Sequence, residues 1–263
     1  MGSANHALAE FRRTKRLSQL DLSLKAEVSA RHISFIETGR AQPSRDILLK
    51  LAEVMGLSHR ECNRLMTECG YAPVYFDRPL DEAAMQPVRQ ALNVMLDNQD
   101  PYPAVVLNSL WDLHMANRSL NRLMSLLLPP DRLQGRINML ELIFDHRGLR
   151  PYMTNWDDVA ALLLRRLTLQ LQTRPNPELG ELLETLLSMD PPADWHAPEP
   201  QGWEGPMLTS ELEINGQHLS VFSTLSSFGT ALDVGLQELM IESYFPSDEA
   251  TRRFFHTLAT EAE

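Results

Sequence analysis

One predicted helix carries side chains that could bond to the base edges of a DNA duplex. On a helical wheel over residues 30–38, at ~100° per residue, Ile33, Ile36 and Glu37 share one side. The opposite side carries Arg31, Ser34, Phe35 and Thr38. Arginine can fork onto O6 and N7 of guanine, and phenylalanine can lie against the methyl group of thymine. The chemistry expected of this face is base recognition rather than bond making.

Residues around this helix could position it on the sugar-phosphate backbone. Ala30 and His32 flank the face near the helix start, where such helices usually approach bases. Polar and basic side chains at helix N-termini, or just after the helix, can bind phosphate. The candidates of this kind are Gln19, Ser29, Arg40, Ser44 and Arg45.

Short helices are expected to hold these residues. Periodic apolar residues, serine caps and glycine stops predict five helices over approximately 5–15, 19–25, 30–38, 44–55 and 58–69. The second and third, with the turn Ala26-Glu27-Val28 between them, form a candidate helix-turn-helix motif. The spacing alone also fits five ordinary helices of an α-helical bundle.

Charge is distributed unevenly along the chain. The formal net charge is −11, but residues 1–76 carry a net charge of +3 and the remainder carries −14. All three lysines, Lys15, Lys25 and Lys50, lie in the first 50 residues. A local cationic surface can meet DNA phosphates while an acidic body faces away, so the acidic total does not exclude nucleic-acid binding.

The segment LSQLDLSLKAEVSARHISFIETGRAQPS, residues 17–44, resembles the phage-repressor-like (XRE-type) helix-turn-helix family. The resemblance implies a DNA-binding domain. It also implies a structural pair between an arginine of the first helix and the glutamate that ends the recognition helix, here Arg12 and Glu37. Glu27 departs from the family pattern, which usually has glycine in the turn. A glutamate there must take a left-handed backbone or shift the turn, at ~1 kcal/mol.

The rest of the chain mixes helices with short strands. A polar stretch broken by proline, residues 77–85, is the predicted linker between a domain over 1–76 and a domain over 86–263. Strands are expected at 104–107, 110–116 and 237–244, and a hairpin joins 207–214 to 218–225 through Asn215-Gly216. Helices are expected between them and over 247–259. The predicted fold class is α+β, a five-helix all-α domain followed by an antiparallel sheet with flanking helices.

Three segments of the second domain, residues 102–124, 138–167 and 221–251, resemble the ligand-binding domain of MmyB-like regulators. The resemblance implies a PAS-like antiparallel sheet whose helices enclose an apolar cavity for a fatty-acyl or similar hydrophobic ligand. Pockets are mostly apolar with a few placed polar groups. The candidate ligand-binding residues are Trp111, His114, Asn117, Phe144, Trp156, Phe222 and Phe228. The alternative for each aromatic residue is ordinary core packing.

No catalytic or metal-binding constellation is evident. The sequence lacks a phosphate-binding glycine loop and the G-x-S-x-G and H-E-x-x-H motifs. Asp145-His146 is a possible acid–base pair, but adjacent residues rarely face one site. His59, Cys62 and Cys69 share a helix face without a fourth ligand, so buried thiols are the expected interpretation. We predict a protein that is not an enzyme and has no catalytic residues, metal or cofactor, apart from a possible bound fatty acid or other hydrophobic small molecule.

The expected partners follow from these features. A homodimer should read a palindromic operator in double-stranded DNA, because one helix-turn-helix domain spans only a half-site. No run of 18 apolar residues and no apolar leader is present, so we expect a cytoplasmic protein without membrane contact. Two alternatives stay open for the second domain: dimerisation or protein interaction alone, or catalysis on a small molecule.

Overall fold

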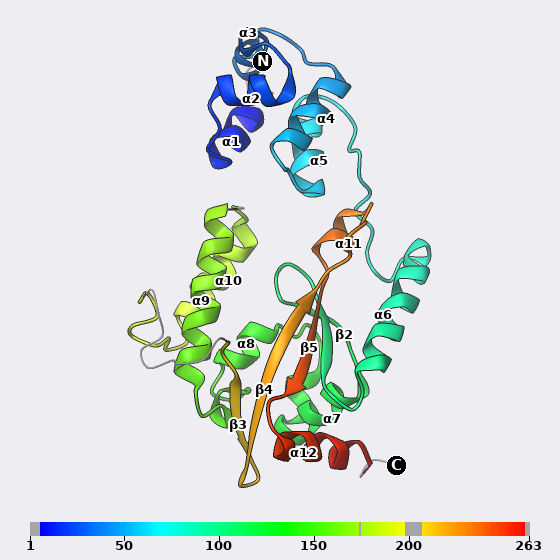
Figure 1. Cartoon of the computed structure of the whole chain (residues 1–263), viewed down its shortest axis with the longest axis vertical. Helices are drawn as coiled ribbons and strands as arrows, with labels where there is room; N and C mark the ends of the chain where they lie inside the picture. Colours follow the sequence, from blue (N-terminus) through cyan, green and yellow to red (C-terminus); the bar gives the residue numbers. More distant parts are fainter. Residues whose placement is uncertain (1–5, 174, 198–206, 261–263) are drawn as a thin grey trace. The chain divides into compact units, whose positions relative to one another are not determined.

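The chain is described by a computed structural model that covers residues 6–173, 175–197 and 207–260. It divides into two compact units (Figure 1). Unit 1 contains the described residues up to Pro79 together with Phe228–Gln237, and unit 2 contains Leu80–Ser227 and the residues from Glu238 onward. The first boundary falls inside the linker predicted over 77–85. No sequence pattern indicated that 228–237 would join unit 1.

Unit 1 consists mainly of five helices, as predicted. They are α1 (His6–Thr14), α2 (Gln19–Ala26), α3 (Ala30–Glu37), α4 (Arg45–Val54) and α5 (His59–Glu68). Serine hydroxyls cap all but the first: each accepts a hydrogen bond from a backbone N–H of the first helical turn, which has no partner within its own helix. The caps are Ser18, Ser29, Ser44 and Ser58.

An apolar core holds these helices together. Leu8, Leu22, Ile33, Ile36 and Leu48 are all fully buried within it. The two cysteines are buried in the same core, and burial raises the pKa of both thiols. Among the residues that the structure describes, no group of three or more metal-ligating side chains is placed to hold an ion.

A five-stranded antiparallel sheet forms the centre of unit 2. Its strands are β1 (Ala104–Leu107), β2 (Leu113–Ala116), β3 (Ser210–Ile214), β4 (Gln217–Ser226) and β5 (Met240–Pro246), in the spatial order β2-β1-β5-β4-β3. Asn215 and Gly216, with φ of 52° and 76°, connect β3 to β4. Both positive φ values suit the tight hairpin turn that Asn-Gly favours. The α+β fold class is therefore confirmed.

Helices pack on both faces of this sheet. They are α6 (Gln86–Gln99), α7 (Arg118–Leu127), α8 (Met139–Phe144), α9 (Trp156–Thr173), α10 (Pro177–Leu187) and α12 (Glu249–Thr260), with 3-10 turns at Ala83–Met85, Pro130–Leu133 and Arg150–Tyr152. In Figure 1, α9 and α10 lie on one side of the sheet and α6 lies on the other. The larger apolar core of unit 2 includes Val105, Phe144 and Val221. We call this the main core, and the face of the sheet that packs against it the inner face. On β4 and β5 it carries Val221, Ser223, Leu225, Met240, Glu242 and Tyr244.

Two strand predictions were wrong at their ends. The strand expected over 237–244 begins only at Met240, because the preceding residues form the short helix α11 (Val234–Glu238). Asp233 favours that turn, since its side-chain Oδ1 accepts a hydrogen bond from Gly235 N and its carbonyl accepts one from Gln237 N. The strand expected from 110 begins only at Leu113, because Trp111 has a positive φ of 65°. The sequence also predicts a proline-rich loop over residues 191–206, and part of that stretch lies outside the described residues.

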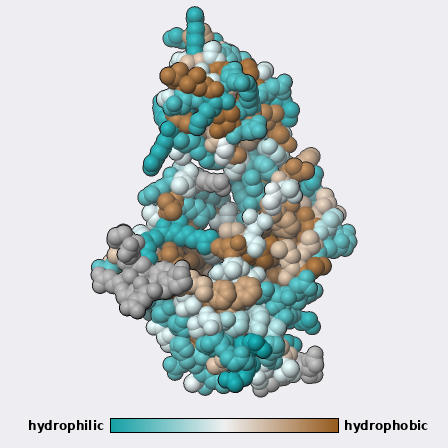
Figure 2. Space-filling view, in the orientation of Figure 1, coloured by the Kyte–Doolittle hydropathy of each residue, from teal (hydrophilic) through white to brown (hydrophobic). Residues whose placement is uncertain are grey.

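The molecular surface is mixed in character. Figure 2 shows hydrophilic residues over much of the visible face, with hydrophobic residues gathered in patches. Leu20 and Leu24 on α2 are among the exposed apolar side chains. Within the described ranges, no helix is both long enough and apolar enough to cross a membrane.

Candidate nucleic-acid interface and ligand-binding domain

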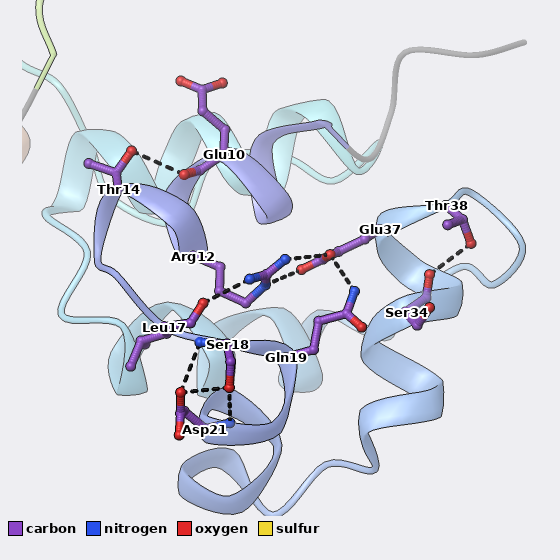
Figure 3. A network of polar contacts seen from close by, with 10 residues as sticks. All are labelled: Glu10, Arg12, Thr14, Leu17, Ser18, Gln19, Asp21, Ser34, Glu37 and Thr38. Carbon is purple, nitrogen blue, oxygen red and sulfur yellow. Dashed lines mark hydrogen bonds and ion pairs between the residues drawn. The ribbon is translucent and has the colours of Figure 1, made fainter.

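A buried ion pair joins the first and third helices. Arg12 Nε on α1 donates to Glu37 Oε1 at 2.6 Å, and Arg12 Nη2 donates to Glu37 Oε2 at 3.0 Å. Gln19 Nε2 on α2 donates to the same Oε2 at 2.7 Å, so three helices meet at one carboxylate (Figure 3). The arginine and glutamate side chains are only 10% and 6% exposed. This network fixes the end of α3 relative to α1 and α2.

The electrostatics of this pair follow from burial and hydrogen bonding. Burial raises the pKa of Glu37, but the hydrogen bonds from Arg12 and Gln19 outweigh burial and hold the pKa below its ordinary value. The hydrogen bond to Glu37 raises the pKa of Arg12. Both groups are therefore charged at neutral pH, and each compensates the other inside the core.

The opposite side of α3 faces outward. Ile33 and Ile36 are fully buried, whereas Arg31 and Thr38 are exposed and Ser34 and Phe35 are half-buried. The guanidinium carbon of Arg31 lies 5.2 Å from the centroid of the Phe35 ring. This contact stacks the arginine on the aromatic ring one helical turn away. The outward face therefore carries a cation supported by a flat apolar surface.

Four of the five residues predicted to contact phosphate are exposed, and the fifth, Gln19, is half-buried. Arg40 and Arg45 are exposed, and Ser29 and Ser44 are helix caps at the N-termini of α3 and α4. The side-chain amide N–H of Gln19 is instead directed to Glu37 (Figure 3). Its structural role could not be foreseen, because it depends on where α1 places Arg12. Ala30 and His32, at the start of α3, are half-buried.

The turn between α2 and α3 contains the expected irregularity. Glu27 has φ 51° and ψ 36°, a left-handed backbone that a residue with a Cβ adopts at a cost. Its carboxylate forms an ion pair with Lys50 Nζ at 2.9 Å. Both side chains of this pair are largely exposed, so the pair adds little stability.

Replacing Glu27 with glycine is expected to stabilise unit 1 by up to about 1 kcal/mol, because glycine takes this backbone without strain. The greater freedom of glycine in the unfolded chain offsets part of the gain. Glu27→Ala is the matched control, since it also loses the Lys50 pair but keeps the strain. Thermal unfolding followed by circular dichroism should rank Glu27→Gly above Glu27→Ala, and the reverse order would contradict the strain argument.

Three of the predicted ligand-binding aromatics share the main core of unit 2. Trp111, Phe144 and Trp156 are buried there together. The rings of Phe144 and Trp156 meet edge to face with their centroids 5.6 Å apart, and Trp156 Nε1 donates to the Ile143 carbonyl. Trp156 therefore has its polar group satisfied by the protein itself.

The other four candidates lie elsewhere. His114 is exposed on the edge strand β2, and Asn117 is the N-cap of α7, where its Oδ1 accepts from Leu120 N and Ala104 N. Phe222 stacks on Phe245, and Phe228 belongs to unit 1. The seven residues are thus not gathered at one place, and their role in ligand binding stays a prediction.

A separate pocket of about 540 Å³ lies beside α12. Its lining includes His218, Arg253 and Phe254, but none of the seven candidates. Sequence reasoning also missed Glu242, a buried carboxyl on the inner face whose pKa burial raises. The signal that could have revealed it is an acidic residue inside the short apolar strand Met240–Pro246.

The fold and the outward face of α3 define a helix-turn-helix DNA-binding protein with a second, α+β domain. A family model of the helix-turn-helix matches residues 8–62. The model of the MmyB-like transcription regulator ligand binding domain matches residues 88–258. The chain therefore belongs to the MmyB-like transcription regulators and carries an XRE-type helix-turn-helix domain. A search of curated proteins finds no match.

Proposed function

We propose that this chain is a sequence-specific transcription regulator whose operator affinity is set by a small hydrophobic, fatty-acyl-like molecule in unit 2. The DNA-binding part of this proposal rests on the outward face of α3, where Arg31 is exposed and lies against the Phe35 ring. On the opposite side of the same helix, the Arg12–Glu37 pair fixes its end to α1. A rigid helix with a cation held outward suits insertion into the major groove.

We further propose a homodimer on a palindromic operator. One helix-turn-helix domain contacts a half-site, and two copies related by a two-fold axis read two half-sites about one helical turn, ~34 Å, apart. The protein then acts in the cytoplasm, where the operator is found, and it works by binding rather than by catalysis. Sedimentation of the protein with a selected operator should give two chains per duplex.

The segment between β4 and β5 offers a route by which a ligand could control DNA binding. Both strands belong to unit 2, whereas residues 228–237 between them belong to unit 1. The Val234 backbone N–H donates to the Phe76 carbonyl at 2.7 Å. Gln237 Oε1 accepts from the backbone N–H of His59, the first residue of α5, at 2.8 Å. Through these bonds, a shift of either strand would be transmitted along the chain to the start of α5.

This segment also packs closely against the other residues of unit 1. Asp233 is buried, and it forms an isolated β-bridge with Phe76. A Cβ added at Gly235 would lie 3.2 Å from the carbonyl oxygen of Arg78. These contacts hold the segment against the rest of unit 1. A ligand would control DNA binding through it only by binding two arrangements of the segment unequally.

Replacing Gln237 with alanine is expected to uncouple operator binding from ligand binding. Coupling between sites typically amounts to about 1–3 kcal/mol, or about 5–150-fold in affinity. Operator affinity would be measured by fluorescence anisotropy with and without saturating decanoate. We expect the ligand to change the affinity of the native protein, and to change that of Gln237→Ala much less.

Gln90→Ala is the control, because Gln90 is exposed on α6 and should leave the coupling intact. A ligand that binds but leaves operator affinity unchanged in the native protein would favour a second domain that serves only for dimerisation. Equal coupling in both variants would exclude the proposed route through residues 228–237.

A further inference from the structure

Helix α6 of unit 2 leaves an apolar face uncovered. Leu92 and Leu96 are buried on one side of this helix, whereas Val94 and Met95 are 59% and 40% exposed. Figure 2 shows hydrophobic residues gathered on the right-hand side of the molecule, where Figure 1 places α6. Contiguous exposed apolar residues mark interaction sites, whereas scattered single ones need no explanation. The exposed side of α6 is therefore a candidate interaction surface.

The exposed residues of α6 repeat at the spacing of a seam between two helices. Pro87, Ala91, Val94 and Asn98 are all exposed, and they follow one another at intervals of four, three and four residues. Such alternation keeps one stripe of side chains facing a partner helix along its whole length. The small side chain of Ala91 allows two helix backbones to approach, and Pro87 lies in the first turn, where proline is tolerated. This face is therefore suited to packing along a second helix.

The charge of the chain favours another copy of α6 as the partner. Residues after 76 carry a net charge of −14, so two copies of unit 2 repel each other unless a nearly neutral face lies between them. The only charged residues of α6 are Arg89 and Asp97, and the guanidinium of the half-buried Arg89 donates to two backbone carbonyls. A strongly charged partner would find no complementary group here, whereas a second α6 meets little repulsion. Helix α10, in contrast, presents three exposed glutamates, Glu178, Glu181 and Glu184.

Asn98 supplies a polar group that can pair with its own copy. Its side chain is exposed, and no described residue forms a hydrogen bond with its amide group. A carboxamide has both donors and an acceptor, so two of them related by a two-fold axis can bond to each other. A two-fold interface requires such self-complementary groups, because the same patch occurs on both sides. A single asparagine within a helix seam also fixes register and the number of helices.

The position of α6 in the chain favours a parallel pair. Only residues 80–85 separate α6 from the part of unit 1 that ends at Pro79. In a parallel pair both helices begin at the same end, so both connections to unit 1 leave from that end. An antiparallel pair would separate the two starts by the length of the helix, about 21 Å for 14 residues. The parallel pair is the arrangement in which two short connections lead to adjacent half-sites of one duplex.

We propose that Pro87, Ala91, Val94 and Asn98 form the homodimer interface, in which two α6 helices pack in parallel about a two-fold axis. This rests on the proposed function, in which two copies bind one palindromic operator, and it assigns the surface that joins them. Val94 lies against its own copy across the axis, and Asn98 hydrogen-bonds to its own copy. A contact limited to one pair of 14-residue helices is small, so the dimer is weak in solution and is strengthened when both copies bind DNA.

Sedimentation of the full-length chain over a range of concentrations, with and without a selected operator, tests this interface. Val94→Glu places two like charges beside the two-fold axis, and we expect it to raise the dissociation constant of the dimer at least about tenfold. Leu169→Glu is the matched control, because Leu169 is 61% exposed on a different helix, α9, and should leave association unchanged. Both substitutions are at exposed positions, so both proteins should keep the circular dichroism of the native chain.

Cross-linking tests the parallel arrangement separately. Asn98→Cys should form a disulfide-linked dimer under mild oxidation, because a parallel pair brings the two copies of residue 98 within disulfide range, a Cα–Cα distance below about 7 Å. The native Cys62 and Cys69 are buried and should compete little. Leu169→Cys is the control and should stay uncrosslinked under the same conditions.

The outcomes separate this interface from the homodimer itself. Loss of association in Val94→Glu together with cross-linking of Asn98→Cys would support the interface. A Val94→Glu protein that associates as strongly as the native chain would overturn the interface and leave the homodimer intact. Loss of association in Val94→Glu without cross-linking of Asn98→Cys would overturn the parallel pair, and the proposal with it. One native chain per operator duplex would overturn both the homodimer and its interface.

Discussion

Replacing Arg12 with alanine is expected to destabilise unit 1 by about 3–5 kcal/mol, because it leaves the carboxylate of Glu37 buried without its counter-charge. A loss of that size is comparable with the whole stability of many small domains. Operator binding should therefore disappear along with the helical fold of unit 1. Gln19 cannot compensate, since its amide carries no charge.

Two optical probes can localise this effect. All four tryptophans lie beyond residue 110, so tryptophan fluorescence does not report on residues 1–79 directly. Far-ultraviolet circular dichroism reports on the helices of both units. In Arg12→Ala we expect an early loss of helical signal in urea, followed by a fluorescence transition close to that of the native protein.

Arg64→Ala provides the matched control for that experiment. Arg64 also pairs with a glutamate of another helix, Glu10, at 2.6 Å, but both side chains are 47% exposed. Exposed pairs contribute about 0–1 kcal/mol. An Arg64→Ala variant as unstable as Arg12→Ala would show that burial is not the reason for the effect.

Replacing Arg31 with alanine is expected to weaken binding to the preferred operator by about 1–3 kcal/mol per half-site, or roughly 5–150-fold. The reason is the loss of a forked contact with a base edge. Stability should change little, because Arg31 is exposed and its described contact is the Phe35 ring. Binding would be measured by fluorescence anisotropy over a range of salt concentrations.

The salt dependence separates base contact from phosphate contact. A residue that neutralises a phosphate lowers the slope of log affinity against log salt by about 1 when it is removed. We expect Arg31→Ala to leave that slope unchanged and Arg45→Ala to reduce it. A reduced slope in Arg31→Ala would assign Arg31 to the sugar-phosphate backbone instead.

Local signals explain why the helices of unit 1 could be predicted. Ser29 and Ser44 cap helices that begin within a residue of the expected position, because a cap depends only on neighbouring residues. The burial of Ile33 and Ile36 likewise follows from helical periodicity. The Arg12–Glu37 pair, in contrast, was expected from a family resemblance and not from spacing.

Contacts between distant parts of the chain could not be predicted in this way. The hydrogen bond between His59 and Gln237 joins residues 178 positions apart, and no local pattern indicates that these residues meet. The hydrogen bond from Ser223 Oγ to Glu242 Oε1 depends on the register of β4 with β5, which places the two residues diagonally across from each other. The positive φ of Trp111 was hidden for a similar reason, since contacts with α8 help to hold it.

A base-by-base binding profile tests whether the outward face of α3 reads DNA sequence. An operator would be selected from random duplexes with the full-length chain, and each position would then be replaced with the other three bases. If Arg31 contacts a base edge, Arg31→Ala is expected to lose discrimination at one guanine per half-site and to keep it at the other positions. An unchanged profile, with all operators weakened equally or not at all, would contradict the claim that this face reads DNA sequence.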